Sequence, residues 1–106
     1  METKTSRPKP ERVQPKFELG KLYGTPGAHE ALSDAELFGL LRRHETGDWG
    51  DVGHEDWASN EDALRTGARL FSVYKMTDDC KVWVITEAED DNGRRQATTV
   101  LLPDEY

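Results

Sequence analysis

Two segments in the middle of the chain carry hydrophobic residues at the spacing of an amphipathic helix. In the first, the stretch "SDAE" places Ser33 three residues before Glu36 as a capping box, which predicts a helix from Asp34 to about Glu45. Its leucines recur at intervals of three and four residues, and the same spacing puts His44 on their face. We therefore expect His44 to be partly buried.

A second helix is predicted from about residue 55 to residue 66, where Gly67 provides the left-handed residue that ends many helices. The stretch between the two helices, "GDWGDVG" at 47–53, has the glycine content of a tight connector. Trp49 and Trp57 lie in or beside it, and large indoles of this kind are usually core residues with a bonded N–H. We expect both tryptophans to be packed inside.

After the second helix the hydrophobic period changes from 3.6 to 2. Strand-length runs of β-branched and aromatic residues, separated by "TDDC" and "DDNGRR", occupy 69–76, 81–87 and 97–102. The alternation at 17–23 allows an additional N-terminal edge strand, which would end at a turn formed by Thr25-Pro26-Gly27. The fold class is α+β: two helices packed on a small antiparallel meander of three strands.

The charge is distributed unevenly between the two ends of the chain. Residues 1–16 contain three prolines and little apolar surface, so we expect a disordered basic tail, followed by a single domain at 17–106. Five basic side chains against two glutamates give the tail a charge of +3. Because the formal charge of the whole chain is −7, residues 17–106 carry −10. A surface of this charge repels nucleic-acid backbones and attracts basic protein patches.

Other classes of protein fit the sequence poorly. No apolar run approaches the roughly 20 residues that span a bilayer, and the N-terminus lacks the hydrophobic stretch of a signal peptide. Cys80 is the single cysteine, which suits a reducing compartment. We predict a cytoplasmic protein without membrane contact and without a cofactor.

Several sequence blocks resemble a known group of proteins. The blocks "KFELG", "TPGA", "RHETGDWGD", "GARLFSVY", "KVWVITEA" and "TTVLLPDEY" occur in this order from about residue 16 to residue 106. They are similar to those of a family of short, largely uncharacterised bacterial proteins carried on plasmids and integrating elements. The resemblance implies a mobile-element origin and no particular chemistry. Where that family commonly runs from "ITEA" into "TT", this chain has the longer loop 88–96.

The most unusual stretch is "RRHETGDWGDVGHEDW", at residues 42–57. A metal site would use the nitrogen and oxygen donors of His44, Asp48, Asp51 and His54. Their spacing matches no established metal signature, and His44 belongs to the apolar face of a helix. We predict no metal here.

A catalytic hypothesis combines the helix with the predicted sheet. Ribonuclease chemistry needs a base, an acid and a cation for the developing phosphorane charge. Candidates for these roles, and for supporting hydroxyls, are His44, Arg69, Ser72, Tyr74, Thr86, Glu87 and Thr99, with His44, Arg69, Ser72 and Glu87 as the central set. Two helices before a meander also loosely resemble small ribonucleases of the barnase and RelE type. A purely structural alternative is that His44 bonds a backbone group and Arg69 pairs with Glu87 across the sheet.

The charge of residues 45–62 favours a different function. This segment contains no lysine or arginine and holds seven acids: Glu45, Asp48, Asp51, Glu55, Asp56, Glu61 and Asp62. Carboxylates spread over a connector and a helix can imitate backbone phosphates and occupy a basic groove on another protein, although solvated acidic helices are also common. Our first prediction is a non-catalytic binding module for a basic protein partner, acting as a nucleic-acid mimic or an inhibitor of a defence system. The ribonuclease-like enzyme is the alternative.

Overall fold

The computed structural model describes residues 14–106, which form an α+β fold built on a four-stranded mixed sheet. The strands are β1 (Lys21–Gly24), β2 (Leu70–Thr77), β3 (Cys80–Thr86) and β4 (Ala97–Leu101). The helices are α1 (Pro26–Ala31), α2 (Asp34–Glu45) and α3 (His54–Thr66), and a 3-10 turn, η2, spans Pro103–Glu105. The expected α+β class is therefore confirmed, with one more helix and one more strand than the core prediction.

The sheet has the strand order β1-β4-β3-β2. The pairs β2–β3 and β3–β4 are antiparallel, as expected for a meander. The N-terminal edge strand is present but shorter than 17–23, and it lies parallel to β4 with Lys21 opposite Ala97. This strand makes the sheet mixed, so the simple antiparallel meander describes only part of it.

The helix boundaries follow their capping residues. Helix α2 has the predicted limits, and both hydrogen bonds of the Ser33–Glu36 capping box form, at 3.1 and 2.8 Å. Helix α1 was predicted as a turn. It forms because the Thr25 hydroxyl accepts a hydrogen bond from the Ala28 backbone N–H, and because proline is favourable in the first helical turn.

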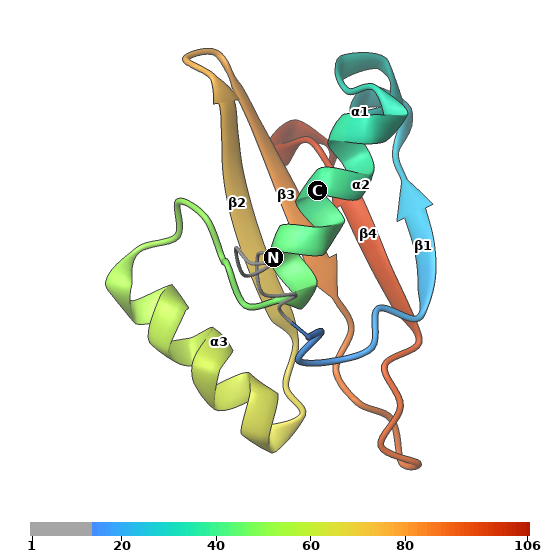
Figure 1. Cartoon of the computed structure of the whole chain (residues 1–106), viewed down its shortest axis with the longest axis vertical. Coiled ribbons are helices and arrows are strands. Elements are labelled where there is room, and N and C mark those ends of the chain that lie inside the picture. The colour runs from blue at the N-terminus through green and yellow to red at the C-terminus, as the bar shows by residue number, and fades with distance from the viewer. Residues whose placement is uncertain (1–13) are drawn as a thin grey trace, which may run out of the picture.

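Helices α1 and α2 cover one face of the sheet, whereas α3 stands beside the β2 edge (Figure 1). The main core lies between α1, α2 and the sheet and contains Ala28, Leu32, Leu37, Leu40, Leu41, Tyr74, Val82, Val84 and Val100. A smaller cluster of Trp49, Ala63 and Leu70 attaches α3 to the rest. Most of the surface of α3 therefore remains in solvent.

The basic tail predicted for residues 1–16 lies outside the described residues except for 14–16. Of these, Lys16 donates its backbone N–H to the Glu45 carbonyl at 2.7 Å, at the end of α2. Between residues 14 and 106 no helix is both long and apolar enough to cross a bilayer.

Candidate functional site

The connector between α2 and α3 runs along β2 and pairs with its outer edge. The Val73 N–H donates to the Trp49 carbonyl at 3.2 Å, and the Asp51 N–H donates to the Val73 carbonyl at 2.6 Å. Gly50 lies between them with φ +76°, and a Cβ at this position would come 2.1 Å from the Val73 carbonyl oxygen. Only glycine allows this approach, because other residues rarely adopt such a φ and would collide with the strand.

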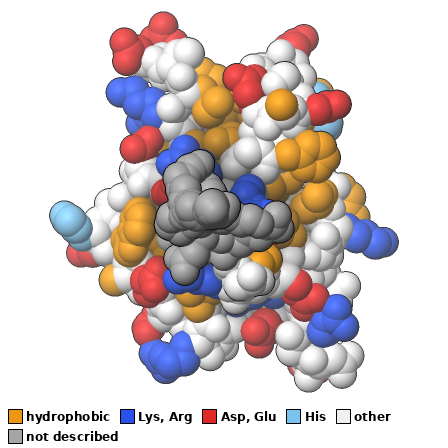
Figure 2. All heavy atoms as spheres, viewed as in Figure 1, with side chains coloured by type: hydrophobic (Ala, Val, Ile, Leu, Met, Phe, Trp, Pro, Cys, Tyr) orange, Lys and Arg blue, Asp and Glu red, His pale blue; other side chains and the backbone are white. Residues whose placement is uncertain are grey.

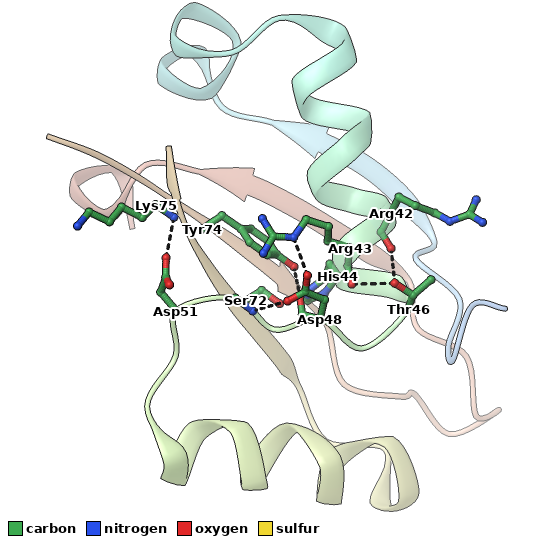
Figure 3. A network of polar contacts seen from close by, with 10 residues as sticks. Arg42, Arg43, His44, Thr46, Asp48, Asp51, Ser72, Tyr74 and Lys75 are labelled. Atoms are coloured by element: carbon green, nitrogen blue, oxygen red, sulfur yellow. Dashed lines mark hydrogen bonds and ion pairs between the residues drawn. The ribbon is translucent and has the colours of Figure 1, made fainter. Parts of the chain in front are cut away.

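Side chains extend this pairing in both directions along β2. Asn60 donates to the Phe71 carbonyl at 2.7 Å and accepts from the Phe71 N–H at 3.0 Å, so its amide substitutes for a neighbouring strand. The Asp51 carboxylate accepts from the Lys75 N–H at 3.0 Å, on the other side of Val73 (Figure 3). The outward backbone groups of β2 from Phe71 to the Lys75 N–H are thus bonded.

Trp49 anchors the connector in the interior. Its side chain is fully buried, its Nε1–H donates to Glu61 at 2.8 Å, and its ring contacts Phe17 and His44. The prediction of a packed Trp49 is confirmed. The same prediction was wrong for Trp57, whose side chain is 38% exposed on α3, because the inward face of this helix is made by smaller residues.

Asp48 links the connector to α2. Its carboxylate accepts from Arg43 Nε at 2.7 Å and from the Gly50 N–H at 3.2 Å, and the Arg43 guanidinium lies 4.5 Å from the centre of the Tyr74 ring (Figure 3). The hydrogen bond from Arg43 holds the pKa of Asp48 below its usual value. The Tyr74 hydroxyl donates to the Asp48 carbonyl at 2.6 Å.

His44 is fully buried and belongs to a chain of hydroxyl groups that crosses the inner face of the sheet. Its Nδ1 lies 2.6 Å from Ser72 Oγ and its Nε2 lies 2.8 Å from Thr86 Oγ1. Thr86 Oγ1 is in turn 2.7 Å from Thr98 Oγ1, and Thr98 donates to the Leu19 carbonyl at 2.7 Å.

The direction of these bonds defines the protonation of His44. Because Thr98 uses its proton on a carbonyl, it must accept from Thr86, and Thr86 must then accept from the imidazole. The Nε2 of His44 therefore carries a proton, and because the low pKa of His44 leaves the imidazole neutral, Nδ1 accepts from Ser72. Burial, reinforced by the charge of Arg95, lowers the pKa of His44 to about 3.

The central catalytic set is divided by the sheet. His44 and Ser72 meet on the inner face, together with Thr86. Arg69 and Glu87 line a cavity of about 280 Å³ on the outer face, with Thr99 also in its wall. Arg69 donates to the Tyr106 hydroxyl at 3.3 Å. The structure therefore brings these residues together in two groups on opposite sides, and both nitrogens of His44 are already bonded to hydroxyls.

The residues considered for a metal are also separated in their roles. Asp48 pairs with Arg43, Asp51 bonds the backbone of β2, and His54 is exposed at the start of α3. Among residues 14–106, no group of three or more His, Cys, Asp or Glu side chains is arranged to hold a metal ion.

The loop at 88–96 has a structural role that its sequence does not predict. Arg95 is only 3% exposed and donates to the carbonyls of Ala63, Ala68 and Glu87 at 3.1, 2.8 and 2.9 Å, which joins the end of α3 to the end of β3. Arg94 forms a two-pronged hydrogen bond with Glu18 and lowers the pKa of that carboxyl to about 2. No local sequence pattern predicts these contacts, because the partners of Arg95 are backbone groups up to 32 residues away.

The seven acids of 45–62 have different environments. Asp48, Asp51 and Glu61 bond groups of the connector and β2, as described above. Asp62 forms an ion pair with Arg65 in which both side chains are about 70% exposed. Within residues 14–106, no hydrogen bond or ion pair occupies the carboxylates of Glu45, Glu55 and Asp56. Only part of the acidic segment is therefore available to another molecule.

No protein-family model, curated protein or solved structure matches this chain. The relation to mobile-element proteins, inferred from the sequence blocks, stays a prediction.

Proposed function

We propose that the chain is a non-catalytic binding module that recognises a basic protein surface through α3. The observation that carries this proposal is the position of α3, which projects into solvent beside the sheet (Figure 1). Its buried residues are Asn60 and Ala63; of its four acids, Glu61 accepts from Trp49 and Asp62 pairs with the exposed Arg65, whereas Glu55 and Asp56 make no bond within the described residues.

The spacing of these acids supports a contact surface. Glu55 and Asp62 are seven residues apart, so they share the helix face that points away from Asn60. Asp56 lies one turn before Asn60, at the rim of a cavity of about 330 Å³ between α3 and the outer face of the sheet. A basic partner that meets α3 would face carboxylates on two sides of the helix.

This surface is narrower than the one predicted from sequence. Asp48, Asp51 and Glu61 bond within the fold, so removing their charges would disturb the connector as well as any partner. The exposed Asp62–Arg65 pair contributes little to stability, because solvent screens it. We therefore assign the contact to Glu55, Asp56 and Asp62. A nucleic-acid-binding protein is the natural class of partner, since carboxylates on a helix can occupy sites meant for phosphates.

The test compares two variants of equal charge. Glu55→Gln, Asp56→Asn and Asp62→Asn combined remove the proposed contact, and Glu30→Gln, Asp79→Asn and Asp91→Asn remove three exposed acids elsewhere. Binding to an array of short lysine- and arginine-rich peptides is measured at low and at physiological salt. At physiological salt we expect the first variant to lose at least about tenfold in affinity and the control to lose less than about threefold, because exposed charges are screened beyond about 8 Å.

Equal losses in the two variants would show that the peptides respond only to net charge, and the assignment to α3 would then be wrong. The ribonuclease alternative has its own readout in the same preparations. Cleavage of RNA by the wild-type chain that disappears in Arg69→Ala or Glu87→Gln would replace the binding proposal, although no contact described above favours it.

A further inference from the structure

The sheet has a second edge, at β1, and this edge is open. In the parallel pair with β4, Lys21 donates to the Gln96 carbonyl at 2.9 Å and Thr25 donates to the Val100 carbonyl at 3.0 Å. Because backbone groups alternate along a strand, the N–H and C=O of Leu22 point away from β4. Among residues 14–106 no strand pairs with this side of β1.

An apolar groove lies directly beside the open edge. It has a volume of about 220 Å³, and its wall includes Leu22, His29, Asp34, Leu37, Phe38 and Leu41. Phe38 is 62% exposed and Leu22 is 46% exposed, although both are large hydrophobic side chains. Hydrophobic side chains gather on this side of the molecule, where α2 faces β1, with acidic side chains close by (Figure 2).

An open strand edge beside an apolar groove is the arrangement that binds extended peptides. The edge supplies hydrogen bonds to the peptide backbone, and the groove accepts every second side chain. One side chain of such a peptide would pack between Leu22 and Phe38 while its neighbour points to solvent.

The surrounding charge selects the occupant. Asp34 lies in the groove wall, so a basic side chain that enters the groove beside an apolar one would meet a carboxylate. The chain as a whole carries −7, so a second copy would bring a like charge to this edge. We propose that the β1–α2 groove binds an extended segment of another protein, added as a strand to β1, in which an apolar side chain and a lysine or arginine two residues away both face the groove. This site is on the opposite edge of the sheet from α3 and does not depend on the function proposed for that helix.

The experiment uses a short fluorescent peptide in which leucine and lysine follow each other at every second position, with serine between them, titrated against the full chain. Two further versions of the peptide carry N-methyl groups on alternate backbone nitrogens, one version along each edge. Each version can therefore form backbone hydrogen bonds on one side only. We expect one methylated copy to bind about as tightly as the parent peptide and the other to bind at least about tenfold more weakly, because only one peptide edge meets β1.

Protein variants locate the site. Leu22→Pro removes the outward N–H without touching a bond to β4, and edge strands tolerate proline. Phe38→Gln removes the exposed ring from the groove and leaves the core side of α2 intact. Each should weaken the parent peptide at least about tenfold, whereas Trp57→Gln, an exposed aromatic on α3, should not. If Leu22→Pro disturbs the fold, Phe38→Gln alone remains decisive.

Three results would overturn the proposal. Equal binding of both methylated copies would mean that charge alone holds the peptide. A concentration-dependent dimer that Phe38→Gln converts to monomer in sedimentation experiments would assign the groove to a second copy. Peptide binding that appears only after deletion of residues 1–13 would assign the groove to the chain's own N-terminal segment.

Discussion

The two edges of the sheet differ in how their backbone groups are used. At β2, a connector and one amide side chain bond the outward groups from Phe71 to the Lys75 N–H. At β1, the outward groups of Leu22 meet no strand among residues 14–106, and a groove runs beside them. Exposed strand edges invite pairing with other chains, so natural sheets usually cover them. The comparison indicates that covering β2 is structural, whereas leaving β1 open is suited to binding.

This difference also explains the unusual composition of the connector. Glycine is needed where the chain passes Val73, aspartate provides acceptors for the Lys75 N–H and for Arg43, and tryptophan fills the space beneath. Residues that suggested chemistry in the sequence are thus required to hold one edge of a sheet.

The largest effect should come from Gly50→Ala. The new Cβ would collide with the Val73 carbonyl, and alanine at φ +76° is strained, so the connector must move away from β2. We expect the free energy of unfolding to fall by about 3 kcal/mol or more, measured by urea denaturation.

Gly39→Ala is the matched control for this substitution. Gly39 lies within α2, and a Cβ there meets nothing within 4 Å. Alanine should stabilise the helix by about 0.5–1 kcal/mol. A loss at Gly50 no larger than the change at Gly39 would contradict the close approach of the connector to β2.

The next effect is expected for Asn60→Ala. The substitution leaves the N–H and C=O of Phe71 without the partners that they have in the fold. The cost should be about 1–3 kcal/mol in the free energy of unfolding. Ser59→Ala, at the exposed neighbouring position, should change it by less than about 0.5 kcal/mol. Similar losses of unfolding free energy in the two variants would mean that the Asn60 side chain does not stabilise the β2 edge.

A gradual effect, of about 2 kcal/mol between pH 6.5 and 5, is expected from pH, through His44 behind the covered edge. The folded chain lowers the pKa of His44 from 6.5 to about 3, so only the unfolded chain takes up this proton between those values. The contribution of His44 to stability is complete above about pH 6.5 and falls by about 1.4 kcal/mol per pH unit as the pH decreases toward 3.

Urea denaturation between pH 7 and about pH 5 measures this slope before most carboxylates begin to titrate. His44→Gln should flatten it, and His54→Gln, at the exposed start of α3, should not. An unchanged slope in His44→Gln would contradict the neutral, buried imidazole.

Much of the fold follows from local sequence patterns. The capping box predicted the start of α2, and alternation located β2, β3 and β4 to within one residue at each end. Helix α1 was missed because a Thr-Pro-Gly sequence suits a turn as well as a helix start, and the Thr25 cap decides between them.

The sites were harder to predict, because they depend on which faces and edges meet. Helical spacing correctly indicated a buried His44, and strand alternation put Ser72 and Tyr74 on one face. It did not reveal that Arg69 and Glu87 lie on the other face from His44, nor that Asn60 and Arg95 bond distant backbone groups. Those contacts join residues that are 8 to 32 positions apart and have no periodic signature.

Amide hydrogen exchange, measured residue by residue by NMR, tests the contrast between the two edges most directly. We predict slow exchange for Phe71, Val73 and Lys75 and fast exchange for Leu22. Tyr23, whose N–H faces β4, is the slow control in the same strand. If Val73 and Phe71 exchange as fast as Leu22, the connector does not close the β2 edge. If Leu22 exchanges as slowly as Tyr23 in the free chain, the β1 edge is not open.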